Sequence, residues 1–133
     1  MSVDTIKQEF AAFVKAYVKS TITTKSVYPL ETVTDIPLLV VEVPISVGTP
    51  TIKSGTTRNT KFRRLVRLYF IDDSPKDITK LCDSFEENYN SHIDYFDECH
   101  PFDISSRTDV YRVFQEKDNL YAIRIDINVI EIR

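Results

Sequence analysis

The sequence predicts an α+β fold, with a mainly antiparallel sheet of about four to five strands and two helices packed on one face. Two segments repeat apolar residues at helical spacing, one near the N-terminus and one after residue 74. Segments rich in β-branched residues lie between and after them, and a short polar connection of the β-hairpin kind joins the last two. The length of 133 residues suits one domain over residues 1–133.

The first predicted element is a helix over residues 3–19. Its apolar residues recur every three to four positions and form one stripe, which consists of Ile6, Phe10, Phe13, Val14, Tyr17 and Val18. A threonine-rich stretch follows, with a short edge strand predicted near residues 26–28. The β-branched run of residues 38–43, between Pro37 and Pro44, then indicates a strand that is buried on both faces.

The connection from this strand to the next covers about residues 44–61 and is predicted to be a long projecting loop. Connections of this length inside compact domains are usually functional or disordered. The following strand, at residues 60–71, alternates its side chains between two faces. One face is predicted to carry Val66, Leu68 and Phe70, and the other to carry Leu65, Tyr69 and Ile71.

The second helix has a strong N-terminal signal, because Ser74 suits the N-cap, Pro75 suits the first helical position and Asp77 has the capping-box spacing. Its predicted apolar face consists of Ile78, Leu81, Cys82, Phe85, Tyr89 and Ile93. Residues 94–106, with Pro101 among them, are predicted to be irregular. The chain closes with a predicted hairpin of residues 110–115 and 120–132.

Composition narrows the class of protein. The net charge of -3 and the pI of about 5.4 argue against a general nucleic-acid binder, so any attraction to phosphate must be local. Two glycines argue against a glycine-rich phosphate loop, and two cysteines are not a disulfide framework. The start of the chain is unlike a signal peptide, and no run approaches the ~20 apolar residues of a membrane helix. These features predict a soluble protein made in a cytoplasm.

The charges are divided unevenly along the chain. Residues 44–71 contain no acid, and their charged residues are Lys53, Arg58, Lys61, Arg63, Arg64 and Arg67. The next stretch, residues 72–103, is strongly acidic with only Lys76 and Lys80 against it. The basic stretch is predicted to contact phosphate backbones or an acidic neighbour. The alternative is an edge strand that uses charge to avoid unwanted pairing. A solvated face normally mixes both signs, which favours the contact surface.

Residue types with catalytic potential are present without a supporting motif. Asp72 and Asp73 could hold magnesium and orient a phosphate, but acids also favour the positive end of the helix that follows them. The metal-ligand types Cys82, His92, Cys99 and His100 match no zinc spacing, and Cys99 beside His100 lacks a third group for nucleophilic catalysis. The sequence therefore predicts no cofactor, no metal site and no enzymatic activity.

The layout as a whole resembles the tail terminator (tail completion) proteins of long-tailed bacteriophages. The resemblance covers most of the chain and is carried by the helix at 3–19, the strand Ile36-Pro37-Leu38-Leu39-Val40-Val41, the long loop into residues 62–72, the helix at 75–90 and the end Asn119-Leu120-Tyr121-Ala122-Ile123-Arg124-Ile125-Asp126-Ile127.

The resemblance implies a structural virion protein with a tail-tube-like fold, which is assembled in the host cytoplasm and located in the tail or neck. Such proteins form a hexameric ring at the head-proximal end of the tail, where they stop tube polymerisation and join the tail to the head. The implied partners are other copies of the chain, the tail tube protein and the head–tail connector protein, with DNA passing through the ring and no membrane.

Carried over to this chain, the resemblance implies that the loop at residues 46–60 reaches a neighbouring subunit or the last tube ring. The six basic residues would then lie at subunit contacts or near the DNA channel, and the acidic helix at residues 75–90 is an equal candidate partner for them in the next subunit. Three alternatives stay open: another head–tail connector or neck component, a small phosphate-processing enzyme that uses Asp72 and Asp73, and a monomeric cytoplasmic module that binds an acidic ligand.

Overall fold

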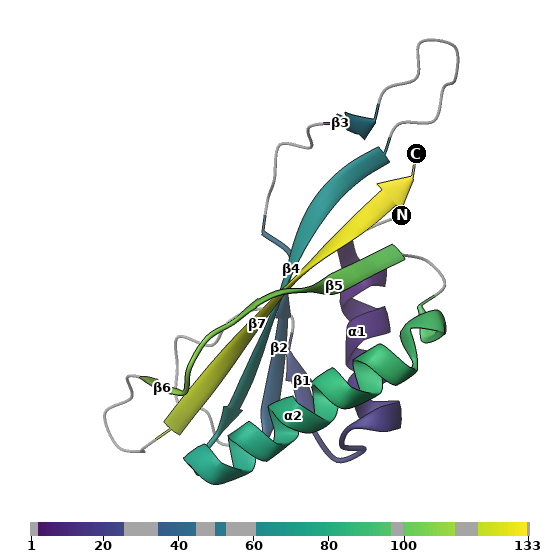
Figure 1. Ribbon diagram of the computed structural model, residues 1–133. Coiled ribbons are helices and arrows are strands. Elements are labelled where there is room, and N and C mark those ends of the chain that lie inside the picture. Colours follow the sequence, from purple (N-terminus) through teal and green to yellow (C-terminus); the bar gives the residue numbers. More distant parts are fainter. Residues whose placement is uncertain are drawn as a thin grey trace.

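The computed structural model describes residues 3–25, 35–44, 50–52, 61–96, 100–113 and 120–132, with the backbone alone at residues 3, 50–52, 61–63, 100–103 and 130–132. The elements, in chain order, are α1 (Val3–Tyr17), β1 (Thr23–Lys25), β2 (Leu38–Glu42), β3 (Pro50–Ile52), β4 (Lys61–Asp72), α2 (Pro75–Ser91), the 3-10 helix η1 (Ile93–Tyr95), β5 (His100–Arg107), β6 (Tyr111–Val113) and β7 (Leu120–Ile132). Figure 1 shows how these elements are arranged.

The described strands form one sheet of seven, in the order β1-β2-β4-β7-β5, with β3 paired to β4 and β6 paired to β7. The predicted α+β class is confirmed. The predicted number of strands was too low, and the sheet is mixed because β1 runs parallel to β2 while the other pairs are antiparallel. Sequence alternation shows that a segment is extended but does not record the direction of its neighbour.

The long strands β4 and β7 form the centre of the sheet (Figure 1). They pair over their whole shared length, from Lys61 opposite Ile132 to Asp72 opposite Tyr121. β2 lies on the other side of β4, with Leu38 opposite Ile71. Because paired residues point to the same side of a sheet, this register decides which residues of the three strands share a face.

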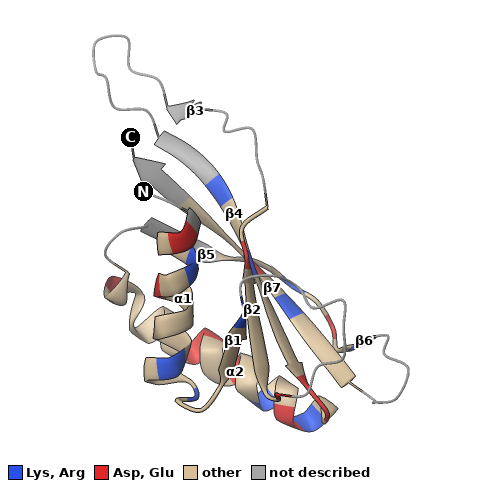
Figure 2. Ribbon diagram, turned by 180° about the vertical axis from the view of Figure 1, so that it is seen from behind, with Lys and Arg blue, Asp and Glu red and all other residues tan. Residues whose placement is uncertain are grey.

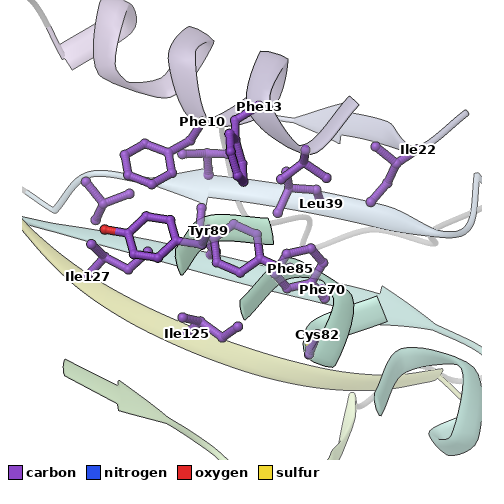
Figure 3. Packing of buried hydrophobic residues seen from close by; sticks show 14 of the residues in the cluster. Phe10, Phe13, Ile22, Leu39, Phe70, Cys82, Phe85, Tyr89, Ile125 and Ile127 are labelled. Atoms are coloured by element: carbon purple, nitrogen blue, oxygen red, sulfur yellow. The ribbon is translucent and has the colours of Figure 1, made fainter. Parts of the chain in front are cut away.

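The first face of the sheet carries the larger core cluster, which we call the first cluster. It joins alternate residues of the central strands to apolar residues of both helices, and Figure 3 shows these side chains meeting. The helices contribute Ile6, Phe10, Phe13 and Val14 from α1 and Ile78, Cys82, Phe85 and Tyr89 from α2. The central strands contribute Val66, Leu68, Phe70, Ile123, Ile125, Ile127 and Val129. The predicted faces of β4 are confirmed, and so is the stripe of the first helix for Ile6, Phe10, Phe13 and Val14. Tyr17 is 38% exposed, and Val18 follows the last residue of α1.

The second face carries a smaller apolar cluster at one end. Its buried members are Leu38, Val40, Ile71, Val113, Leu120 and Ala122. This cluster includes no helical residue, and it ends where the charged residues of the second face begin. The strand at 38–42 is therefore buried on both faces, as its β-branched run predicted.

The second helix begins where the sequence predicts. Ser74 is the N-cap, and its Oγ accepts a hydrogen bond of 3.3 Å from the backbone N–H of Asp77. Pro75 stands at the first helical position. The apolar face is confirmed for Ile78, Cys82, Phe85 and Tyr89, whereas Ile93 lies in η1 and is 41% exposed. The helix ends before Ile93, so its side chain leaves the buried stripe.

Two other expectations about local structure were wrong. Residues 100–107, placed within an irregular segment, form β5, and register shifts near Pro101 and Ile104 let that strand pair with β7. The predicted loop at 44–61 contains β3, which pairs with the start of β4. The first edge strand lies at Thr23–Lys25, while residues 26–28 fall outside the described part of the chain.

Within the described ranges, neither helix combines the length and the apolar character that crossing a bilayer requires.

Candidate interaction surface

The structure describes the predicted basic residues unevenly. Lys53 and Arg58 lie outside the described residues, while Lys61 and Arg63 belong to β4 with only their backbone described. Arg64 and Arg67 are both half-buried and stand on opposite faces of β4, as strand alternation predicts. The ion pairs of Arg67 define the candidate site.

Arg67 is compensated by acids from both neighbouring strands. Glu42 of β2 and Asp126 of β7 stand directly opposite it in the register. Its Nη1 lies 3.8 Å from Glu42 Oε1, and its Nε lies 3.8 Å from Asp126 Oδ1. The basic stretch has no acid of its own in the sequence, but the sheet supplies two to this arginine. The absence of acids in a linear window therefore does not predict an uncompensated charge on a sheet.

Asp126 is the most buried member of this group, with 8% of the residue exposed. Its Oδ1 lies 3.3 Å from Arg124 Nε, and its Oδ2 accepts a hydrogen bond of 3.2 Å from Ser106 Oγ. Its carboxylate thus stands between two guanidinium groups and is held from the β5 side by a hydroxyl. Buried carboxylates of this kind need such partners, because desolvation alone strongly disfavours the charge.

We call Glu42, Arg67, Arg124 and Asp126 the arginine strip. The side chains of Arg67, Glu42 and Arg124 are its outer part, because they are 32%, 34% and 35% exposed, whereas that of Asp126 is 11% exposed. The Nε atoms of both arginines and Oδ1 of Asp126 are buried and make no hydrogen bond. The contacts between them are therefore ion pairs that lack the geometry of hydrogen bonds. Figure 2 shows lysine and arginine along β4 and β7.

The helix α2 carries the opposite charge in its second half. Asp83, Glu86 and Glu87 lie there, and the last turn of α2 has no basic residue. We call these three residues the acidic half of α2, and Figure 2 shows acidic residues on this helix. Acids that precede a helix C-terminus do not offset its partial negative charge. Their position is therefore not explained by the stability of the helix itself.

One arginine of the sheet compensates part of this acidic half. Arg107, at the end of β5, donates from Nη1 to Asp83 Oδ1 at 2.8 Å and to Glu86 Oε2 at 2.6 Å. Burial alone would lower the pKa of Arg107, but the hydrogen bonds to these two acids outweigh it and raise the pKa. Glu87 is exposed, and no ion pair of the described residues involves it.

The two acids considered for phosphate chemistry occupy the turn between β4 and α2. The backbone N–H of Asp73 donates to Asp72 Oδ1 at 2.8 Å, and burial is the main cause that raises the pKa of Asp72. A surface pocket of about 410 Å³ has Asp72 in its wall, together with Val18, Lys19, Pro37, Asp77, Lys80, Leu81 and Ser84. Asp73 is exposed and does not line it, so the pocket does not bring the two carboxylates together.

The candidate metal ligands do not come together within the described part of the chain. Cys82 is fully buried in the first cluster, and burial raises the pKa of its thiol to about 12. The neutral thiol therefore packs there as a small apolar group. His92 is the C-cap of α2 and stacks on Tyr17 at 4.3 Å between ring centroids. Cys99 lies outside the described residues, and the described part of the chain holds no group of three potential metal ligands.

Sequence reasoning missed Glu42, Arg124 and Asp126 as members of the site. Arg124 and Asp126 alternate with the residues of β7 that belong to the larger core cluster and lie on the opposite face, yet Asp126 is buried. The sequence did contain a signal for these residues. Arg124 and Asp126 carry opposite charges on one face of a strand, and this pattern indicates that neighbouring strands supply charged partners. The register that joins them to Arg67 could not be read from that pattern.

Comparison with protein-family models finds no match for this chain, and comparison with curated proteins finds no similar sequence.

Proposed function

We propose that this protein is a structural subunit that assembles into a ring and caps the head-proximal end of a bacteriophage tail tube, as tail terminators do. In this role it would end tube polymerisation and join the tail to the head connector in the virion. Its partners would be other copies of itself, forming a hexamer, together with the tail tube protein and the connector protein. DNA would pass through the ring.

The observation that supports this proposal is the open sheet. Among the described strands, β1 and β3 lie on one edge of the sheet and β5 and β6 on the other, and β1 and β5 differ in length, direction and sequence. An edge strand offers unpaired backbone groups to another chain. Contacts between two different surfaces of one subunit are head-to-tail, and they generate a ring when the rotation closes. A sheet with unlike edges is therefore suited to ring assembly.

In the architecture that we propose for this ring, both helices cover the same face of the sheet and leave the other face to neighbouring subunits. The first cluster supports this arrangement, because it joins Phe13 of α1 and Phe85 of α2 to Leu68 of β4 and Ile125 of β7. The rings of Phe13 and Phe85 meet edge to face at 5.9 Å. The arginine strip belongs to the opposite face of the same strands.

The proposal is tested by native mass spectrometry of the full chain over a range of concentrations, with negative-stain imaging of the same samples. The expected result is a discrete hexamer with a central hole. A second sample lacking residues 48–57 should remain folded and fail to assemble, because this segment is expected to reach a neighbour. A chain that stays monomeric alone and in the presence of tail tube protein would contradict the proposal.

Another neck component of the same virion, such as a connector, is the nearest alternative. Whether the protein binds rings of the tail tube protein distinguishes a tail terminator from such a component.

A phosphate-processing enzyme is a further candidate, which the pocket containing Asp72, Lys19 and Lys80 favours. An assay of magnesium-dependent phosphate release from nucleotides and phosphomonoesters tests it. Activity that Asp72→Ala abolishes in a folded protein would support the enzyme.

A further inference from the structure

We propose that the arginine strip of one copy binds the acidic half of α2 on a second copy. This inference deepens the proposed ring and rests on it, since it names the two surfaces that meet. The second face of the sheet thus contacts helix α2 of an identical chain, and the arginines bind the carboxylates of that helix.

The arginine strip has the properties of a built contact site. The side chain of Asp126 is 11% exposed, and its Oδ1 makes no hydrogen bond although two guanidinium groups stand within 4 Å of it. The carboxylate forms ion pairs with the Nε ends of Arg67 and Arg124, whose side chains remain 32% and 35% exposed. Two guanidinium groups held in this way present preorganised donors to an acceptor outside the chain.

The acidic half of α2 supplies acceptors of matching chemistry. Glu87 is exposed, and the side chain of Asp83 is 63% exposed even though it accepts from Arg107. Carboxylates are the acceptors that a guanidinium group binds best. The charges of the two surfaces are therefore complementary at short range, and they lie on different parts of one subunit, as a head-to-tail contact requires.

A nucleic-acid phosphate backbone is less suited to the strip. Glu42 and Asp126 balance the formal charge of the two arginines, and the whole chain has a net charge of -3. A phosphate polymer is attracted by an excess of positive charge over a distance, which this group does not have. A single carboxylate that meets the outermost donors needs no such excess.

The experiment compares self-association of the full chain and its variants by native mass spectrometry and analytical ultracentrifugation. Arg124→Glu and Glu87→Lys should each weaken association at least tenfold, and the double variant, which exchanges the two charges, should recover most of it. Arg124→Gln serves as a milder variant, and thermal melting shows which variants fold. Arg112→Glu and Asp109→Lys are matched controls, because they change exposed charges outside both surfaces.

Recovery in the double variant establishes the contact. Assembly of a ring that none of the variants weakens would overturn this inference and leave the proposed function standing. Dimers that respond to the charge exchange but never close into a ring would support the inference and overturn the ring. A wild-type chain that associates neither alone nor in the presence of tail tube protein would overturn both. Binding of a short DNA duplex that Arg124→Gln abolishes, with association unchanged, would assign the strip to phosphate instead.

Discussion

The two faces of the central strands β4 and β7 differ in the kind of interaction that their side chains make. On the first face, residues such as Leu68 and Ile125 are fully buried among apolar side chains of both helices. On the second face, at the adjacent position of each strand, Arg67 meets Asp126 across the β4–β7 pair. The first face contributes stability through non-directional burial, whereas the second contributes oriented charges of small net energy. One strand pair thus provides both a core and a contact surface.

The largest expected effect lies in the first cluster. Phe13 is fully buried and meets five other aromatic rings. Phe13→Ala should lower the free energy of unfolding by about 3–5 kcal/mol, because it removes buried area and leaves a cavity. Urea unfolding followed by circular dichroism measures the change. The control is Tyr17→Ala, whose side chain is on the same helix but is 38% exposed, and which should cost much less. Equal losses would contradict the comparison.

A smaller effect is expected from the arginine strip. Asp126→Ala removes the carboxylate between two half-buried guanidinium groups and should cost about 1–2 kcal/mol, since the arginines regain only part of their hydration. The matched control is Glu42→Ala, which removes the more exposed acid beside Arg67 and should cost less than about 1 kcal/mol. Both are measured by chemical denaturation. A loss at Asp126 as large as that at Phe13 would show that the strip is part of the core.

The smallest effect concerns Asp72, a half-buried acid that lacks the flanking arginines of Asp126. Its pKa in the folded protein is raised above the ordinary value of 3.8, mainly by burial, so folding favours the protonated form. The fold therefore loses stability as the pH rises above the unfolded pKa. Asp72→Asn should raise the melting temperature at about pH 7 and change it little at about pH 3, where both states are protonated. Asp109→Asn, which makes the same change at an exposed position, is the control and should change the melting temperature little.

Much of the fold was predictable from local patterns. The N-cap at Ser74 depends on residues within one helical turn, and the burial of Phe10 and Phe13 follows from their spacing on one stripe. The faces of β4 follow from alternation. These features depend on residues close in the sequence, which is why the sequence records them.

The candidate site was predictable only in part. Arg67 was named from the sequence, but its partners Glu42 and Asp126 come from strands far away in the chain. The strand at His100–Arg107 was missed because Pro101 breaks the local pattern, and only pairing with β7 through shifted register makes it a strand.

The sequence by itself determined the two helices, the faces of the central strands and the division of charge along the chain. Tertiary structure decided the parallel pairing of β1 with β2, the place of β5 in the sheet and the neutralisation of Arg67. The physical reason is that helix stripes, caps and strand alternation arise from neighbours along the chain. Strand order and register, by contrast, depend on which distant segments bury one another best.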